Sequence, residues 1–411
     1  MVLRSQQSRA LVTLAKNQCG QVIVPTGGGK TLIMILDALR RFRESTTPLT
    51  IVVCAPRILL TDQLSAEFLE HIDFANVLHV HSGETHHYST TKVSKISQWN
   101  SLVKDEHKII FTTYNSLGKI NESNVEVDVA YYDEAHNATN KNFFISVAEC
   151  SATNYYYFTA TPKHSKTPYG TGMNNSIVFG KVIENVSATE LVRNGSILNP
   201  TVLTHEVDID RQKGISAASD DAQTLLSILD NLDEQTGSKV LVATPNSKVL
   251  WESLSNTTLI KDLHTRGYDV LHITSKYGAY VNKTKVTRQQ FFDVFTKWGK
   301  DPDRKFVIFH YSILSEGINV HGLTHTIMMR NLNLIEMAQT IGRVIRLNPQ
   351  DAEDIACGII PAGEFNMYRK STGFVTVPVF KNYGRATQHK LENLVHTVFV
   401  DGVPAVTVSN T

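Results

Sequence analysis

A short glycine-rich segment, VIVPTGGGKT at residues 22–31, constrains the fold of this chain more than any other stretch. The run Gln21–Val24 has the length and β-branching of a buried strand, and the segment LIMILDALRRF after Thr31 has helical spacing. A strand, a glycine turn and a helix in this order bring backbone N–H groups and the positive end of a helix dipole to one point. The pattern predicts a phosphate-binding loop in a parallel α/β sheet.

The residue types within the loop match that chemistry. Lys30 supplies a positive charge for phosphate oxygens, and the Thr31 hydroxyl can hold Mg²⁺. The strict G-x-x-x-x-G-K-[ST] spacing fails because Val24 stands in the place of the first glycine. A linker turn or a helix cap is the alternative, but neither would select lysine and threonine together behind three glycines. The predicted nucleotide-binding residues of the loop are Thr26, Gly27, Gly28, Gly29, Lys30 and Thr31.

A pair of carboxylates about a hundred residues later suits the same reaction. In VDVAYYDEAHNA, Asp133 and Glu134 end an apolar, strand-like run. Asp133 can anchor Mg²⁺, and Glu134 can orient or deprotonate the water that attacks a γ-phosphate. An acidic strand end is common and carries little weight alone. Together with the glycine loop upstream, the pair predicts ATP hydrolysis with Mg²⁺.

The order of motifs over nearly the whole chain resembles the superfamily 2 helicases and translocases. LRSQQ looks like the glutamine motif that reads adenine, with Gln7 as the best match, and PTGGGKT resembles motif I. The segment IVVCAPRILLTDQL is similar to motif Ia, FTTYNSL to motif Ib, DEAH to motif II and YYYFTATP to motif III. The resemblance implies nucleic-acid contacts at Arg57, Thr112 and Thr113.

The second half of the chain continues this resemblance. KVLVATPNSK looks like motif IV, with Thr244 near nucleic acid, and HYSILSEGINVHGLTHTI resembles motif V, with Gly317 and Asn319 near the nucleotide. Asn319 stands where many relatives carry aspartate. QTIGRVIR resembles motif VI, and its Q-x-x-G-R-x-x-R spacing predicts three side chains on one helical face. The resemblance implies that these side chains are catalytic and that two of them are arginine fingers. The three residues are Gln339, Arg343 and Arg346.

The motifs predict two RecA-like domains, each a mostly parallel sheet flanked by helices, with the ATP site in the cleft between them. A length of 411 residues exceeds what one core usually supports. We expect the first domain at residues 1–198 and the second at 199–411. A strand is expected in DIACGIIPA at 354–362, a surface loop at 211–221 and a closing helix in ATQHKLENLVHTVFV at 386–400.

Composition limits the partners of the chain. A net charge of +1 argues against a broadly basic surface, so any nucleic-acid site is local. The four cysteines form no C-x-x-C pair, and no apolar run approaches 18 residues, which together predict a cytoplasmic setting without membrane contact. The motifs look closest to the branch of UvsW-type phage helicases, XPB-type helicases and restriction-enzyme motor subunits. We therefore expect a monomer that acts on DNA, single-stranded or as a branched duplex, while a protein partner stays open.

Alternatives remain open at this level. An RNA helicase shares every nucleotide-binding motif, and a restriction motor subunit or a nucleotide-dependent binding protein would carry them too. The lysines and arginine of SKYGAYVNKTKVTRQQ, residues 275–290, are candidates for nucleic-acid backbone contact, with a solvated loop as an equal alternative. In LHVHSGETHH, residues 78–87, His79 and His81 alternate with apolar residues as on a strand, which favours a structural role over a metal site.

Overall fold

The computed structural model describes residues 3–83, 85–232, 238–274, 276–311 and 322–409. The chain divides into two compact units: unit 1 is Met1–Ser187 with Pro404–Thr411, and unit 2 is Ala188–Val403. Their limits differ from the expected division at 198/199. The last strand belongs to unit 1 because β17 (Thr407–Ser409) pairs in parallel with β7 (Lys163–Ser165).

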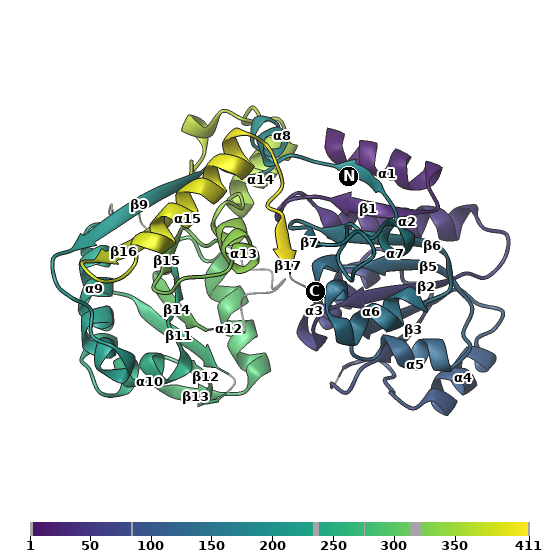
Figure 1. The fold of residues 1–411 in the computed structure, drawn as a ribbon, viewed down its shortest axis with the longest axis horizontal. Coiled ribbons are helices and arrows are strands. Elements are labelled where there is room, and N and C mark those ends of the chain that lie inside the picture. The colour runs from purple at the N-terminus through teal and green to yellow at the C-terminus, as the bar shows by residue number, and fades with distance from the viewer. Residues whose placement is uncertain (1–2, 84, 233–237, 275, 312–321, 410–411) are drawn as a thin grey trace. The chain divides into compact units, whose positions relative to one another are not determined.

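Unit 1 is built on one seven-stranded sheet in the order β3-β4-β2-β5-β6-β1-β8 (Figure 1). Every pairing in it is parallel, so all strands end at the same edge. The expected strand at 21–24 is β1, which begins two residues earlier. The strands are β1 (Cys19–Ile23), β2 (Thr50–Ala55), β3 (Asn76–Val80), β4 (Lys108–Thr113), β5 (Val127–Tyr132), β6 (Ala152–Thr159) and β8 (Val182–Asn185).

Helices cover both faces of this sheet. Consecutive tyrosines of β5 show the two faces, because Tyr131 donates to Asp37 of α2 at 2.6 Å while Tyr132 packs in the core on the side of α4, α5 and α6. Tyr156 and Tyr157 of β6 are buried as well. The helices are α1 (Ser5–Lys16), α2 (Lys30–Glu44), α3 (Ile58–Leu69), α4 (Val93–Leu102), α5 (Leu117–Glu122), α6 (Lys141–Ala148) and α7 (Ser176–Phe179), with a 3₁₀ turn η1 (Ala135–Thr139).

Unit 2 contains an eight-stranded sheet in the order β13-β12-β11-β14-β10-β15-β16-β9. Six strands are parallel, and β12 and β13 extend the sheet as an antiparallel hairpin. The mostly parallel sheet that the motifs predict is therefore confirmed in both units. The strands are β9 (Pro200–Val207), β10 (Lys239–Ala243), β11 (Asp269–Thr274), β12 (Gly278–Val281), β13 (Thr284–Val286), β14 (Phe306–His310), β15 (His325–Met328) and β16 (Gly373–Phe380).

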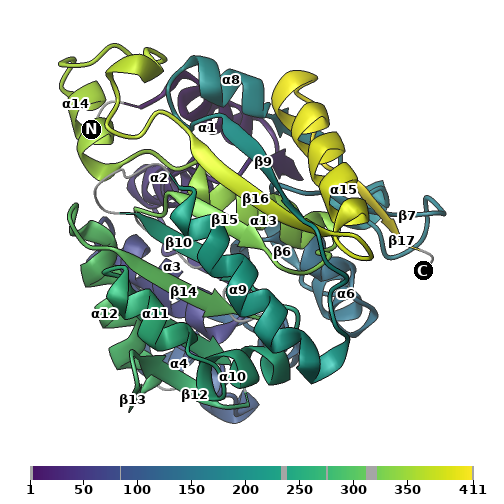
Figure 2. The same ribbon diagram turned by 90° about the vertical axis from the view of Figure 1, so that its left-hand side faces the viewer.

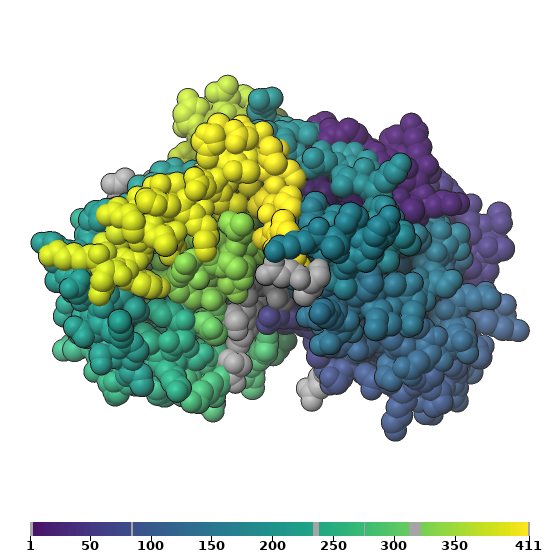
Figure 3. Space-filling model, in the orientation of Figure 1, coloured from purple at the N-terminus to yellow at the C-terminus, as the bar shows by residue number. Residues whose placement is uncertain are grey.

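Helices α9, α10 and α11 bury one face of this sheet and stand before the strands in Figure 2. On the other face, Phe295 of α12 makes an edge-on ring contact with Phe306 of β14. Figure 3 shows α15, in yellow, on the surface of the unit. The helices are α8 (Ala188–Arg193), α9 (Ala217–Asp230), α10 (Ser247–Ser255), α11 (Leu259–Thr265), α12 (Arg288–Lys300), α13 (Leu334–Val344), α14 (Pro349–Ala356) and α15 (Arg385–Val395), with the short turns η2 (Gly214–Ser216), η3 (Phe365–Met367) and the π-helical η4 (His396–Val400).

Three local predictions for unit 2 had different outcomes. The closing helix is confirmed as α15, which continues into η4. The strand expected at 354–362 is wrong, because the side chain of Asn348 caps α14 and Pro349 takes its first position, and these start signals outweigh the apolar run. The loop expected at 211–221 already enters α9 at Ala217. Among the described residues, no helix is long and apolar enough to cross a membrane.

Candidate active site

The glycine loop of unit 1 connects the end of β1 at Ile23 to the start of α2 at Lys30. Gly27 and Gly29 have φ angles of 85° and 88°, which side-chain-bearing residues rarely adopt. Gly29 lies at the N-terminus of α2, where backbone N–H groups lack partners within the helix. The loop therefore has the backbone form that exposes amide groups to a phosphate.

Gln7 of α1 lies against this loop. A side chain at Gly29 would run into the amide nitrogen of Gln7, so the two residues are in close approach. The side-chain oxygen of Gln7, Oε1, accepts a hydrogen bond from the backbone N–H of Arg4 at 3.0 Å, which fixes the buried side chain at the start of α1. The structure thus brings together two motifs that stand about twenty residues apart in the sequence.

Asp133 and Glu134 follow directly after β5 at the same edge of the sheet. The backbone of Asp133 is fixed on both sides: its N–H donates to Cys54 O at 2.8 Å, and its carbonyl oxygen accepts from Tyr114 Oη at 2.9 Å. Glu134 has a left-handed backbone, φ 46° and ψ 51°, which is unusual for a residue with a side chain. Such strain is retained where the surroundings hold a side chain in a required place.

Charge is unbalanced around these carboxylates. Both are buried, and Lys30 of the glycine loop lies beside them, with its Nζ 3.8 Å from Glu134 Oε1. Burial, followed by the charge of Glu134, raises the pKa of Asp133 to about 7, and Lys30 opposes this shift. Within the described residues, Asp133 Oδ1 is buried without a hydrogen-bond partner. Such carboxylates suit a divalent cation, and the glycine loop with its lysine suits a phosphate group.

One contact in unit 1 was missed by the sequence reasoning. His136, the last residue of DEAH, lies 3.5 Å from Glu134 Oε2 through its Nδ1 atom. The same Nδ1 lies 3.0 Å from Thr159 Oγ1, the first threonine of the segment TATP. One imidazole therefore joins motif II to motif III. Only the histidine of DEAH itself could have signalled this link.

In unit 2, the predicted motif VI residues lie at α13. Gln339 and Arg343 are four residues apart on this helix and are buried. The helix ends at Val344, so Arg346 lies in the turn beyond it. The expectation that three side chains share one helical face is therefore wrong for Arg346, because the helix is shorter than the motif.

Arg343 belongs to a cluster of positive charge that the sequence did not show. His310 at the end of β14 is buried, and burial, Arg343 and Arg330 together lower its pKa to about 3. Arg330 follows β15, donates to Tyr311 O at 2.6 Å and lies 4.7 Å from the centre of the Tyr311 ring. Such a cluster of cations suits an anion as ligand.

A buried lysine holds the end of α13. Lys370 Nζ donates to Val344 O at 2.5 Å, to Arg346 O at 2.9 Å and to Leu323 O at 2.6 Å. Burial lowers the pKa of Lys370 to about 7, whereas three carbonyl acceptors match the three donors of its ammonium form. Lys370 thereby fixes the backbone that carries the two motif VI arginines, and no sequence motif pointed to it.

The remaining predicted residues fall into two groups. Gly317 and Asn319 of motif V lie outside the described residues. Of the residues expected to contact nucleic acid, Arg57 at the start of α3 is exposed, and three threonines are buried. Thr112 Oγ1 donates to Val80 O at 3.0 Å and Thr244 Oγ1 to His310 O at 2.9 Å. The buried threonines are Thr112, Thr113 and Thr244.

Two family models match the chain and cover both sets of motifs. The model described as type III restriction enzyme, res subunit, matches residues 1–164, and the helicase conserved C-terminal domain matches residues 221–348. The chain belongs to the restriction-motor branch of the superfamily 2 helicases. Its two α/β units are accordingly the RecA-like domains of a helicase-type motor.

Solved structures share the fold of this helicase-family chain. The ATP-dependent type ISP restriction-modification enzyme LlaBIII bound to DNA is similar with a TM-score of 0.70 and 16% identity, over 99% of this chain and 31% of that one. A nuclease-deletion mutant of the type ISP enzyme LlaGI, in complex with a DNA substrate mimic, is similar with a TM-score of 0.66 and 16% identity. The match covers 99% of this chain and 30% of that one. The helicase-family chain thus spans under a third of the length of these enzymes. No curated protein matches it.

Proposed function

We propose that the chain is an ATP-dependent motor that moves along DNA or remodels it, as a helicase or translocase. The observation that carries the proposal is in unit 1, where a left-handed, buried Glu134 and a desolvated Asp133 lie beside the lysine of a glycine loop. This set of groups suits phosphoryl transfer, which depends on positioning and charge stabilisation. The family membership supports the same reaction class.

Each site residue of unit 1 has a definite role in this proposal. Glycine amides and Lys30 bind the phosphates of ATP, and Gln7 reads adenine beside the loop. Thr31 and Asp133 would hold Mg²⁺, which supplies positive charge that draws Asp133 into its ionised form. Glu134 orients the attacking water and accepts its proton. His136 contacts both Glu134 and Thr159, so it transmits a change in the position or charge of Glu134 to motif III.

In the proposed cycle, unit 2 supplies the conditional step. The resemblance to helicases supports a role for Arg343 and Arg346 in stabilising charge on the transferring phosphoryl group, with Gln339 beside them. An arginine of this kind contributes on the order of 10³ to 10⁵ in rate. Hydrolysis that waits for the arginines depends on the conformation of the whole motor, which is the requirement for stepwise movement.

DNA is the proposed track. The two similar enzymes are described as bound to DNA or to a DNA mimic, which supports DNA over RNA. On this chain, Arg57 and the β12–β13 hairpin offer exposed cations, among them Lys283 and Lys285. Next to the hairpin, Trp251 stacks on Tyr277 with ring centres 4.6 Å apart. Cations beside aromatic rings favour contact with a nucleic-acid strand.

The test is a panel of nucleic acids in two assays, ATP turnover and displacement of a labelled strand. Single-stranded DNA, duplex DNA, forks, four-way junctions and RNA hybrids are compared at one salt concentration, because phosphate contacts make binding salt-dependent. We expect DNA to stimulate turnover more than RNA does. Stimulation by RNA equal to or above that by DNA would contradict the choice of substrate.

A restriction motor subunit is the second candidate. It is favoured by the family model of residues 1–164 and by the small share of the type ISP enzymes that the chain spans. Such a subunit would turn over ATP weakly alone and gain activity with a partner that co-purifies with it. Full strand displacement by the isolated chain would favour the first candidate.

A further inference from the structure

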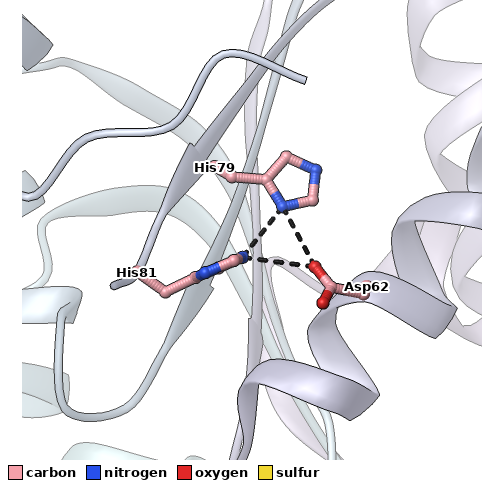
Figure 4. A group of neighbouring side chains, drawn as sticks. All are labelled: Asp62, His79 and His81. Atoms are coloured by element: carbon pink, nitrogen blue, oxygen red, sulfur yellow. Dashed lines mark hydrogen bonds and ion pairs between the residues drawn. The ribbon is translucent and has the colours of Figure 1, made fainter. Parts of the chain in front are cut away.

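A cluster of two histidines and one aspartate lies in unit 1, apart from the carboxylates and the glycine loop. His79 is on β3 and His81 follows two residues later, so both side chains point to the same side of the strand. Asp62 comes from α3, which covers that side (Figure 4). His79 and His81 are buried, and one third of the Asp62 side chain is exposed. We propose that Asp62, His79 and His81 form a binding site for a divalent transition metal, with Zn²⁺ as the expected ion.

The distances between the three ligand atoms fit one metal ion. His79 Nδ1 lies 2.9 Å from His81 Nε2, and Asp62 Oδ1 lies 3.6 Å from the first nitrogen and 3.4 Å from the second. Zinc holds nitrogen and carboxylate ligands at about 2.0 to 2.2 Å in a tetrahedron, which places its ligand atoms about 3.3 to 3.5 Å apart. An ion therefore fits between the three atoms without a large movement of the backbone, and one coordination position is left for water.

The hydrogen bonds around the cluster leave one acceptor unsatisfied. Gly83 N–H lies 3.2 Å from His81 Nδ1, so the proton of this neutral ring is on Nε2 and points to His79 Nδ1. Among the described residues, Asp62 Oδ1 is then buried without a hydrogen-bond donor. The lone pair of His79 Nδ1 and the Asp62 carboxylate thus converge on the single proton of His81 Nε2. A divalent cation would satisfy all three ligand atoms at once.

The surroundings hold His79 as a metal ligand. Because His79 Nδ1 accepts from His81, the proton of the His79 ring is on Nε2, which lies 3.0 Å from Oγ of Ser65, one turn after Asp62 on α3. This arrangement leaves Nδ1 for the ion. His79 N–H donates to Tyr88 O at 2.9 Å and its carbonyl oxygen accepts from Thr90 N at 3.0 Å, so the backbone is fixed.

The donor set indicates the class of metal. Two imidazoles and one carboxylate suit Zn²⁺, Co²⁺ or Ni²⁺, whereas Mg²⁺ prefers six oxygen ligands. Binding at His81 Nε2 moves the proton of that ring to Nδ1 and gives up the contact with Gly83. The ion would join α3 to β3 and restrain the start of α3, where Arg57 lies.

The test uses the full chain stripped of metal with a chelator and titrated with Co²⁺ in excess Mg²⁺. Visible absorption of bound Co²⁺ reports its coordination, and thiolate absorption in the near ultraviolet would reveal binding to cysteine instead. We expect one equivalent to bind without a thiolate band, and Zn²⁺ to displace it. Zn²⁺ should also raise the melting temperature of the chain.

Two variants and one control decide the assignment. Asp62→Asn keeps the size of the side chain but removes its charge, and His81→Ala removes a ligand; each should lower Co²⁺ affinity at least tenfold. His86→Ala, an exposed histidine in the same loop, should bind as the parent does. Equal affinity of the parent and Asp62→Asn, with circular dichroism showing both folded, would overturn the proposal. A parent chain that binds no Co²⁺ equivalent would do so as well.

Discussion

The two units carry opposite charge at the ends of their central strands. In unit 1, two buried carboxylates after β5 lie beside Lys30, and burial and the charge of Glu134 raise the pKa of Asp133 to about 7. In unit 2, Arg330 and Arg343 surround a buried histidine whose pKa falls to about 3. Arg330 is also paired with Glu336, since its Nη1 lies 3.6 Å from Glu336 Oε2. The difference teaches that unit 1 is suited to a metal-bound nucleotide, and unit 2 to an anion.

The largest effect is expected in unit 1, where loss of either charge partner should end the chemistry. Lys30→Ala removes the phosphate ligand and Glu134→Gln removes the base, so each should reduce ATP turnover to the background of a phosphate-release assay. The exposed pair Lys119 and Glu122 provides matched controls, Lys119→Ala and Glu122→Gln, with parental turnover expected. ATP turnover at the parental rate in Lys30→Ala or Glu134→Gln would contradict the assignment of the nucleotide site to unit 1.

The next largest effect should come from unit 2 and should separate binding from turnover. Arg343→Ala is expected to lower ATP turnover by on the order of 10³, the lower end for an arginine that stabilises phosphoryl charge. Binding of a fluorescent ATP analogue should persist, because the glycine loop is in unit 1. Arg385→Ala, an exposed arginine on α15, is the control. Parental turnover in Arg343→Ala would refute its role as an arginine finger.

A smaller effect on kcat is expected from the buried lysine Lys370 of unit 2, and a second buried lysine, Lys239, serves as its control. Lys370→Met frees the end of α13, and a displaced arginine should cost about tenfold to 100-fold in kcat. Lys239 similarly donates to Gly299 O and Asp301 O at the end of α12, so Lys239→Met loses comparable hydrogen bonds. Both variants should lose about 1 to 3 kcal/mol in the free energy of unfolding by urea denaturation. An equal loss of kcat in both would show that Lys370 acts through stability alone.

The smallest effect concerns the pH dependence of stability in unit 1. The pKa of Asp133 is about 7 in the native state against 3.8 in the unfolded chain, so between these pH values the native state binds more protons. The free energy of unfolding should therefore fall as the pH rises from about 4 to 7, by up to about 1.4 kcal/mol per pH unit. Asp133→Asn should flatten this part of the profile in urea unfolding, and the exposed control Asp105→Asn should leave it unchanged. Identical profiles for all three proteins would contradict the desolvation of Asp133.

Much of unit 1 could be predicted because its signals are local. A β-branched run, three glycines and a helical spacing define β1, the loop and α2 within about twenty residues, and the structure bears out this order. The same reasoning failed for the strand expected at 354–362, where an Asn-Pro helix start upstream outweighed a short apolar run. It also failed for Arg346, since nothing in the motif marks the end of α13 at Val344.

The roles of residues outside the motifs could not be predicted, because they depend on contacts between distant segments. Lys370 lies 24 residues after Arg346 and reaches its carbonyl oxygen only through the pairing of β15 with β16. The histidines of LHVHSGETHH were expected to be structural, since no cluster of cysteines or carboxylates accompanies them in the sequence. The third member of their cluster, Asp62, is brought to them from α3 by the fold.

The sequence alone determined the class of the protein: the two α/β units, the order of the helicase motifs and the residues that we propose to bind phosphate. It could do so because these features are local: the glycine loop, the β-branched strand and the charged residues at fixed spacing each lie within one short segment. Only the tertiary structure decided how strongly each group is perturbed, from the raised pKa of Asp133 to the pairing of Asp62 with His79. Burial and the meeting of distant side chains set these properties, and neither is written in local spacing.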